Sequence, residues 1–137
     1  MENKIKHLEF IQNVITRMNT NSFQLKGWML TIVSALLALY ANSDNVTYIF
    51  VAIAPVLIFG ALDAYYLQQE RKFRGMYDDV VANKVELFAM PLNNYKYVKG
   101  DNKSKKYCYC SVFFSKTIIL LYGTITILLI VGGLLMQ

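Results

Sequence analysis

Three long runs without a charged residue constrain the fold of this chain more than any other feature of its sequence. They cover residues 27–43, 45–62 and 117–137. A helix that crosses a bilayer needs about 20 mostly apolar residues, with about 17 as the lower limit. Lys26 can lengthen the first run by snorkelling to the interface, and membrane helices tolerate a proline such as Pro55 as a kink. Each run is therefore long enough to span a membrane.

Composition separates this interpretation from a soluble helix bundle. Of the 137 residues, 55% are hydrophobic and 17% are charged, whereas soluble domains carry about 25% charged residues. In a chain this short, the residues outside the three runs are too few to bury three fully apolar helices away from water. We therefore predict an all-α membrane protein with three transmembrane helices.

The positions of the basic residues predict the orientation. All 14 lie either before the first run or between Arg71 and Lys116, and the connection 42–45 between the first two runs has none. Basic segments next to membrane helices stay in the cytoplasm. We therefore expect the N-terminus inside and the C-terminus outside. No secretory signal peptide is expected, because the first apolar run begins too late and lacks a small-residue cleavage pattern.

The sequence divides into four segments: an amphipathic cytoplasmic helix within 1–25, a transmembrane hairpin over 26–67, a basic cytoplasmic segment over 68–116, and a third transmembrane helix over 117–137. In the first segment, apolar residues recur at spacings of three and four over 3–19, which is typical of a helix that lies in the headgroup layer or packs on neighbouring protein. The polar residues 19–22 predict a bend into the first span.

The basic segment is expected to begin as a continuation of the second span. Good helix formers follow Leu62, and Pro91 is the first strong helix breaker after it. Tyrosine occupies every second position in 95–98 and in 107–110, on either side of a Gly-Asp-Asn turn signal. This pattern predicts either a short β-hairpin or a basic loop.

One acidic residue interrupts the apolar part of the second span. Asp44, at the tip of the hairpin, lies almost midway in the sequence between Lys26 and Asp63. Because both helices rise about 1.5 Å per residue, the two side chains reach nearly equal depth. We expect them to form an ion pair at the inner interface, the alternative being an Asp63 that snorkels alone. Trp28, Tyr65 and Tyr66 would form an aromatic belt there, and the pair would join a charged collar with Arg17, Glu70, Arg71 and Arg74.

The residue inventory argues against an enzyme. The chain has one histidine, His7, and it has no glycine-rich phosphate loop and no histidine-rich metal spacing. We expect His7 to be a surface or interfacial residue. Cys108 and Cys110 should be unliganded thiols in a reducing cytoplasm, because a lone C-x-C lacks the second ligand pair of a structural zinc site. No cofactor or metal is predicted.

Small residues within the spans mark candidate seams between helices. Gly, Ala and Ser allow the close backbone approach that drives helix association in lipid. The candidates for oligomer packing are Ser34, Ala38, Gly60, Ala64, Gly123 and Gly132. Thr117, Thr124 and Thr126 could instead line a water-filled passage, which three spans can enclose only as an oligomer.

Two segments together carry a resemblance, HLEFIQNVITRM followed by NSFQLKGW (7–28 with a gap) and LDAYYLQQERKFRGMYDDV (62–80). They resemble a group of small bacterial inner-membrane proteins, mostly of unassigned function, that share an N-terminal helix, a helical hairpin and an E-R-x-F-R continuation. The resemblance extends from the N-terminal helix to Val80 and implies a multi-pass location in the bacterial inner membrane. The matching positions are Arg17, Asn21, Ser22, Phe23, Lys26, Gly27, Trp28, Asp63, Tyr65, Tyr66, Glu70, Arg71 and Arg74.

The resemblance and the chemistry lead to two hypotheses of different class. Proteins of this general build occur as effectors of anti-phage systems, so the first hypothesis is an oligomeric effector that permeabilises the inner membrane. Its basic cytoplasmic segment would receive an anionic ligand, RNA or a protein partner. The second is a non-conducting anchor or regulatory subunit that recruits a cytoplasmic partner. A phage holin fits the size, but the expected outer C-terminus without a basic tail argues against it.

Overall fold

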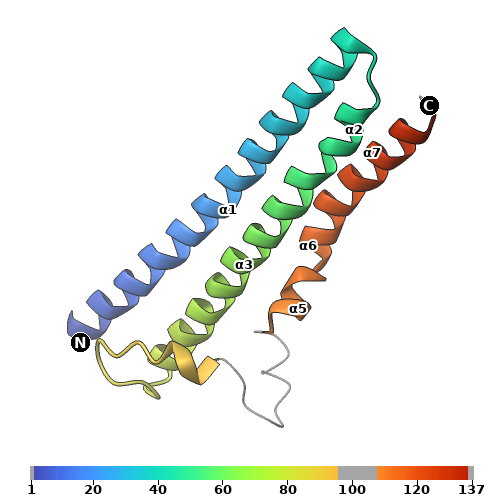
Figure 1. Cartoon of the computed structure of the whole chain (residues 1–137). Coiled ribbons are helices and arrows are strands. Elements are labelled where there is room, and N and C mark those ends of the chain that lie inside the picture. Colours follow the sequence, from blue (N-terminus) through green and yellow to red (C-terminus); the bar gives the residue numbers. More distant parts are fainter. Residues whose placement is uncertain (1, 96–107, 136–137) are drawn as a thin grey trace. The chain divides into compact units, whose positions relative to one another are not determined.

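The structure, a computed structural model, describes residues 2–95 and 108–135. These residues form helices and loops without a strand, so the predicted all-α class is confirmed for the part of the chain described. The elements are α1 (Glu2–Ser43), α2 (Thr47–Val51), α3 (Ile53–Val81), the 3-10 helix η1 (Leu92–Tyr95), α5 (Tyr109–Phe113), α6 (Lys116–Ile118), the π-helical turn η2 (Ile119–Gly123) and α7 (Thr124–Leu135) (Figure 1).

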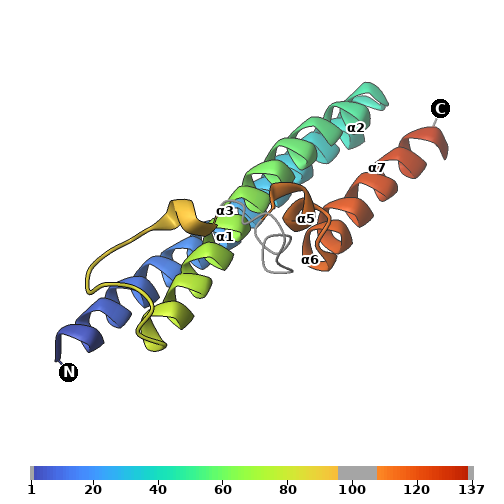
Figure 2. The same cartoon turned by 90° about the horizontal axis from the view of Figure 1, so that it is seen from below.

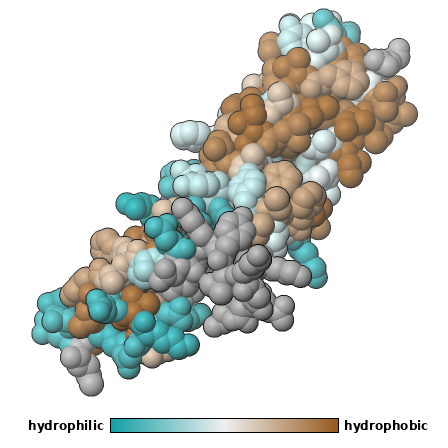
Figure 3. Space-filling view, turned by 60° about the horizontal axis from the view of Figure 1, so that its bottom comes forward, coloured by the Kyte–Doolittle hydropathy of each residue, from teal (hydrophilic) through white to brown (hydrophobic). Residues whose placement is uncertain are grey.

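Three helices are long and apolar enough to cross a membrane, namely Glu2–Ser43, Thr47–Val81 and Lys116–Leu135. They cover residues 27–43, 47–62 and 117–135 of the three runs predicted from the sequence. The chain divides into two compact units. Unit 1 comprises Met1–Ser22 and Tyr65–Val112, and unit 2 comprises Phe23–Ala64 and Phe113–Gln137. Hydrophobic side chains dominate the face of unit 2 shown in Figure 3, whereas polar side chains gather over unit 1.

The bend predicted at 19–22 is wrong, because α1 runs without interruption through these residues. Hydroxyl-bearing side chains here form hydrogen bonds with their own helix. The Thr16 Oγ1 donates to the Gln12 carbonyl and the Thr20 Oγ1 donates to the Thr16 carbonyl, both at 3.0 Å. Such back-bonding gives these hydroxyl groups a hydrogen-bond partner inside the helix.

The first and third helices both end on a residue with positive φ. After α1, Asp44 has φ 50° and its N–H donates to the Tyr40 carbonyl at 2.8 Å. After α3, Asn83 has φ 56°; its N–H bonds the Val80 carbonyl, and the N–H of Lys84 bonds the Asp79 carbonyl. The second pattern is a Schellman motif. It needs a residue with positive φ, a backbone conformation that Asn adopts more readily than most residues do. The predicted end near Pro91 is therefore wrong, and the helix stops at Val81.

Pro55 breaks the second span near one end instead of kinking its middle. A proline has no N–H for the carbonyl four residues back, and its ring clashes with that carbonyl. The residue four back is Val51, where α2 ends, and a turn at Ala52 separates α2 from α3.

Unit 1 is held together by a core between the start of α1 and the end of α3, which run side by side (Figures 1 and 2). The buried members of this core are Ile11, Val14, Ile15, Phe73, Met76 and Val80. The apolar positions of the N-terminal segment therefore pack on protein within the same chain. In unit 2, buried side chains come from α1, α3 and the last span, among them Met29, Val56 and Leu129.

The predicted choice between a β-hairpin and a basic loop falls mainly on residues 96–107, which lie outside the described residues. At the edges of that segment, Tyr95 ends η1, and Tyr109 and Cys110 begin α5.

Candidate functional site

An ion pair inside unit 2 is the chemically most distinctive feature of the helices that are long and apolar enough to cross a membrane. The Lys26 Nζ lies 2.7 Å from the Asp63 Oδ2, and the two side chains are 25% and 1% exposed. The pair expected from the spacing around Asp44 is thus present in the structure. A buried charge is tolerated only with a partner, so this contact ties α1 to α3 at a defined register.

Tyr122 adds the last span to this site, and the sequence analysis missed it. Its side chain is 6% exposed, and its buried hydroxyl lies close to the Asp63 carboxylate without a hydrogen bond among the described residues. Its ring packs over Gly60, where an added Cβ would lie 3.3 Å from two ring carbons. Tyr122 belongs to the π-helical turn η2, a type of turn that frequently occurs at functional sites. The sequence signal that could have pointed to Tyr122 is an aromatic residue with a hydroxyl group, six positions after Lys116.

His7 is buried, so the expectation of a surface or interfacial residue is wrong. It is 0% exposed in unit 1. Its Nδ1 accepts a hydrogen bond from the Phe88 N–H at 3.2 Å, and the two rings lie 5.6 Å apart. Phe88 has φ 62°, which is strained for a bulky residue. The histidine therefore holds the segment after α3 against α1.

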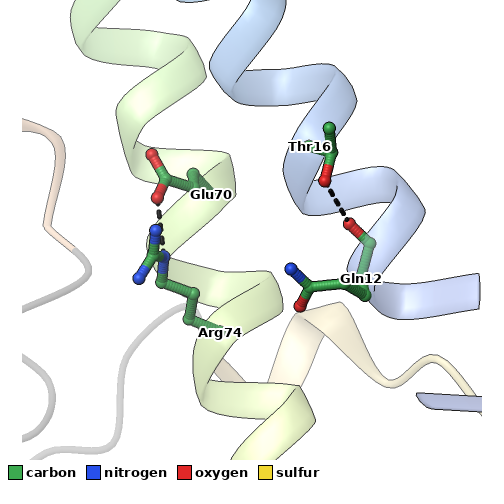
Figure 4. A network of polar contacts seen from close by, with 4 residues as sticks. All are labelled: Gln12, Thr16, Glu70 and Arg74. Atoms are coloured by element: carbon green, nitrogen blue, oxygen red, sulfur yellow. Dashed lines mark hydrogen bonds and ion pairs between the residues drawn. The ribbon is translucent and has the colours of Figure 1, made fainter. Parts of the chain in front are cut away.

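A polar hollow of about 430 Å³ lies between α1 and α3 in unit 1. The cation that lines it is Arg74, whose Nε lies 2.6 Å from the Glu70 Oε1 (Figure 4). Gln12, Thr16 and Asp78 also line the hollow. Since Glu70 already balances Arg74 and Asp78 adds a negative charge, the hollow is polar without being a strongly cationic site.

The other predicted interface residues are found in both units. Trp28 is 64% exposed on α1 in unit 2. In unit 1, Tyr65 is 50% exposed, and its ring meets that of Tyr66 edge to face with centroids 5.9 Å apart. Arg17 is exposed and Arg71 is partly buried in the same unit. A single collar that joins these charges to the Lys26–Asp63 pair stays a prediction.

The candidate packing residues fall into two groups. Gly60 and Ala64 are buried within unit 2, so their small size serves contacts inside the chain. Ser34 and Ala38 are exposed on α1. An added Cβ at Gly132 would meet nothing within 4 Å, and one at Gly123 would meet only an Ile119 methyl carbon at 3.7 Å. The second group is available for contacts with other molecules.

Metal chemistry finds no support among the described residues, which contain no group of three or more His, Cys, Asp or Glu side chains able to hold an ion. Cys108 and Cys110 are thiols at the start of the α5 region.

No protein-family model, curated protein or solved structure matches the chain.

Proposed function

We propose that this protein is an oligomeric effector that permeabilises the bacterial inner membrane in anti-phage defence. The observation that supports the proposal is that a single chain buries only a small part of the residues in its three candidate spans. In the most apolar windows of the three spans, 11%, 33% and 22% of the residues are buried. Three helices packed this loosely enclose no pore, but they leave apolar faces for other copies. Small exposed residues such as Ser34 and Ala38 allow close approach on those faces.

The proposed resting state is harmless, so the permeable assembly must be a minor state that a trigger binds better. Unit 1 is the proposed receiver, with an anionic ligand, RNA or a protein partner as the trigger. Arg74 supports this role, because its side chain is 61% exposed although it is paired with Glu70. Arg71 lies one helical turn earlier on α3, which continues into unit 2 without a break.

A second candidate function, a non-conducting anchor, is favoured by the segment that follows α3. Leu87 and Phe88 are 53% and 59% exposed. Exposed large apolar side chains outside the predicted spans are typical of a surface that contacts a partner.

The orientation is part of the proposal and has a direct test. A reporter that is active only in the cytoplasm should work when fused to the N-terminus or inserted within 95–106, because basic segments stay inside. It should be inactive when fused after Gln137. A reporter insertion within 42–45 serves as a second outside control. Activity of the C-terminal fusion would contradict the three-span arrangement.

The effector function is tested by membrane-potential dye measurements in cells under phage challenge, with the native neighbouring genes present. Wild-type protein should depolarise the cells. The double variant Arg71→Gln/Arg74→Gln should lose triggered depolarisation while still inserting in the membrane, because it removes the exposed charge proposed to meet the trigger. Lys84→Gln, an exposed lysine of the same unit, is the control and should depolarise like wild type. If wild-type protein never depolarises the cells, the anchor replaces the effector.

A further inference from the structure

Unit 2 contains an apolar groove that the proposed function does not use. It has a volume of about 390 Å³ and runs between α3 and the helices of the last span. Its lining includes Val56, Leu57, Gly60, Ile119, Tyr122 and Ile127. Thr126 also lines it, but the Thr126 hydroxyl donates to the Tyr122 carbonyl of its own helix at 2.7 Å. The surface that the groove offers to an occupant is therefore almost entirely hydrocarbon.

The groove opens outward from the protein. Leu57, Phe114 and Ile127 line it and are 56%, 69% and 61% exposed. An occupant must be apolar, narrow and able to enter from the bilayer. A helix is at least about 10 Å wide and rises about 5.4 Å per turn, so a hollow of this volume holds about one turn, whereas packed helices meet along several. A single acyl chain suits the groove better than a helix of a second copy does.

A basic residue adjoins the groove lining in the sequence, at the start of the last span. Phe113, Phe114 and Ile118 line it on either side of Ser115 and Lys116 in the sequence. Lys116 is exposed and directly precedes the uncharged run 117–137. A phosphodiester headgroup can pair with this exposed lysine.

We propose that the groove is a phospholipid site, in which an acyl chain lies along α3 and α7 and an anionic headgroup is bound by Lys116. This inference goes beyond the proposed effector function and does not depend on it. An anchor and an effector would both carry the site.

Native mass spectrometry of the full chain tests the proposal. The protein is released from bilayer discs made with equal amounts of phosphatidylglycerol and phosphatidylcholine, and retained lipid is identified by mass. Wild type should retain phosphatidylglycerol in preference to phosphatidylcholine. Ile127→Trp fills the groove and should retain lipid about tenfold less, since displacing two methylene groups of the acyl chain costs about that factor. Leu128→Trp, at a neighbouring 70% exposed position outside the groove lining, should retain lipid like wild type.

The headgroup contact has its own variant. Lys116→Gln should abolish the preference for phosphatidylglycerol, because the lysine distinguishes the two lipids by net charge, while leaving total retention near that of phosphatidylcholine. Circular dichroism of every variant establishes that the helices form. Equal retention by Ile127→Trp and Leu128→Trp, or no preference in wild type, would overturn the proposal. A loss of dimer in Ile127→Trp without a change in lipid retention would assign the groove to a second copy instead.

Discussion

Replacing Lys26 with methionine is expected to lower the free energy of unfolding of unit 2 by about 3–5 kcal/mol, the usual cost of breaking a buried ion pair by removing one partner. The remaining carboxylate of Asp63 is 1% exposed, so water reaches it poorly. Asp63→Leu should cost less, because the Lys26 side chain is 25% exposed and a long lysine can extend to the interface. The two substitutions differ in their cost because the Asp63 side chain is more deeply buried than the Lys26 side chain.

The double variant Lys26→Met/Asp63→Leu should be more stable than Lys26→Met alone, because it replaces a charge pair with apolar side chains of similar size. Stability is measured by thermal unfolding in a mild detergent for wild type, both single variants and the double variant. Lys6→Met is the control. Lys6 Nζ lies 2.6 Å from Glu2 Oε1, but the side chains are 59% and 80% exposed, so the change should stay below about 1 kcal/mol. Additive effects of the two single substitutions would show that the residues are not coupled.

Gly133→Leu is expected to destabilise unit 2 by about 1–3 kcal/mol, the range measured when a packed core is overfilled. An added Cβ at Gly133 would lie 3.0 Å from the Phe50 Cζ and 3.4 Å from an Ile49 side-chain carbon. These residues belong to α2, which packs against α7. The leucine would therefore push two helices of the same chain apart.

Gly132→Leu is the matched variant, one position earlier, where an added Cβ meets nothing within 4 Å. It should leave the thermal unfolding of unit 2 unchanged. If Gly132 lies on a face between copies, the same variant should reduce the assemblies seen by crosslinking in membranes, since close approach of helices needs small residues. Equal destabilisation by the two substitutions would contradict the packing described for α7. Unchanged crosslinking would remove Gly132 from the oligomer face.

The sequence determined the features that depend on counting and on charge. Three uncharged runs predicted three spans because the bilayer thickness fixes a minimum helix length. Nearly equal distances from Asp44 predicted the Lys26–Asp63 pair because two helices of a hairpin share the same rise per residue. The class of the fold and its central polar contact were therefore readable without coordinates.

Local hydrogen bonding decided where the helices begin and end. Helix propensity favoured a continuation to Pro91, but the Schellman motif at Asn83 ended α3 at Val81. The helix α1 continues through 19–22 without the predicted bend, and there the Thr20 Oγ1 donates to the Thr16 carbonyl of the same helix. These helix boundaries depend on hydrogen bonds between individual carbonyl and amide groups, which average helix propensities do not describe.

Tertiary packing decided which polar residue of the N-terminal helix faces the protein. His7 lies four positions before Ile11, and both are buried in unit 1. Periodicity places them on one face of α1. A polar side chain is accepted on that face only because the Phe88 N–H meets its ring nitrogen, and Phe88 comes from a distant part of the sequence.

In the last span, too, the sequence alone did not identify which residues are buried, but the reason is different. The π-helical turn 119–123 departs from the period of 3.6 residues, so the helix faces on either side of it do not follow one pattern. Sequence alone therefore could not select Tyr122 as the residue beside Asp63. Nor could it distinguish the buried Gly133 from Gly132, where an added Cβ would meet nothing within 4 Å, because only the packing of α2 against α7 makes these neighbouring glycines different.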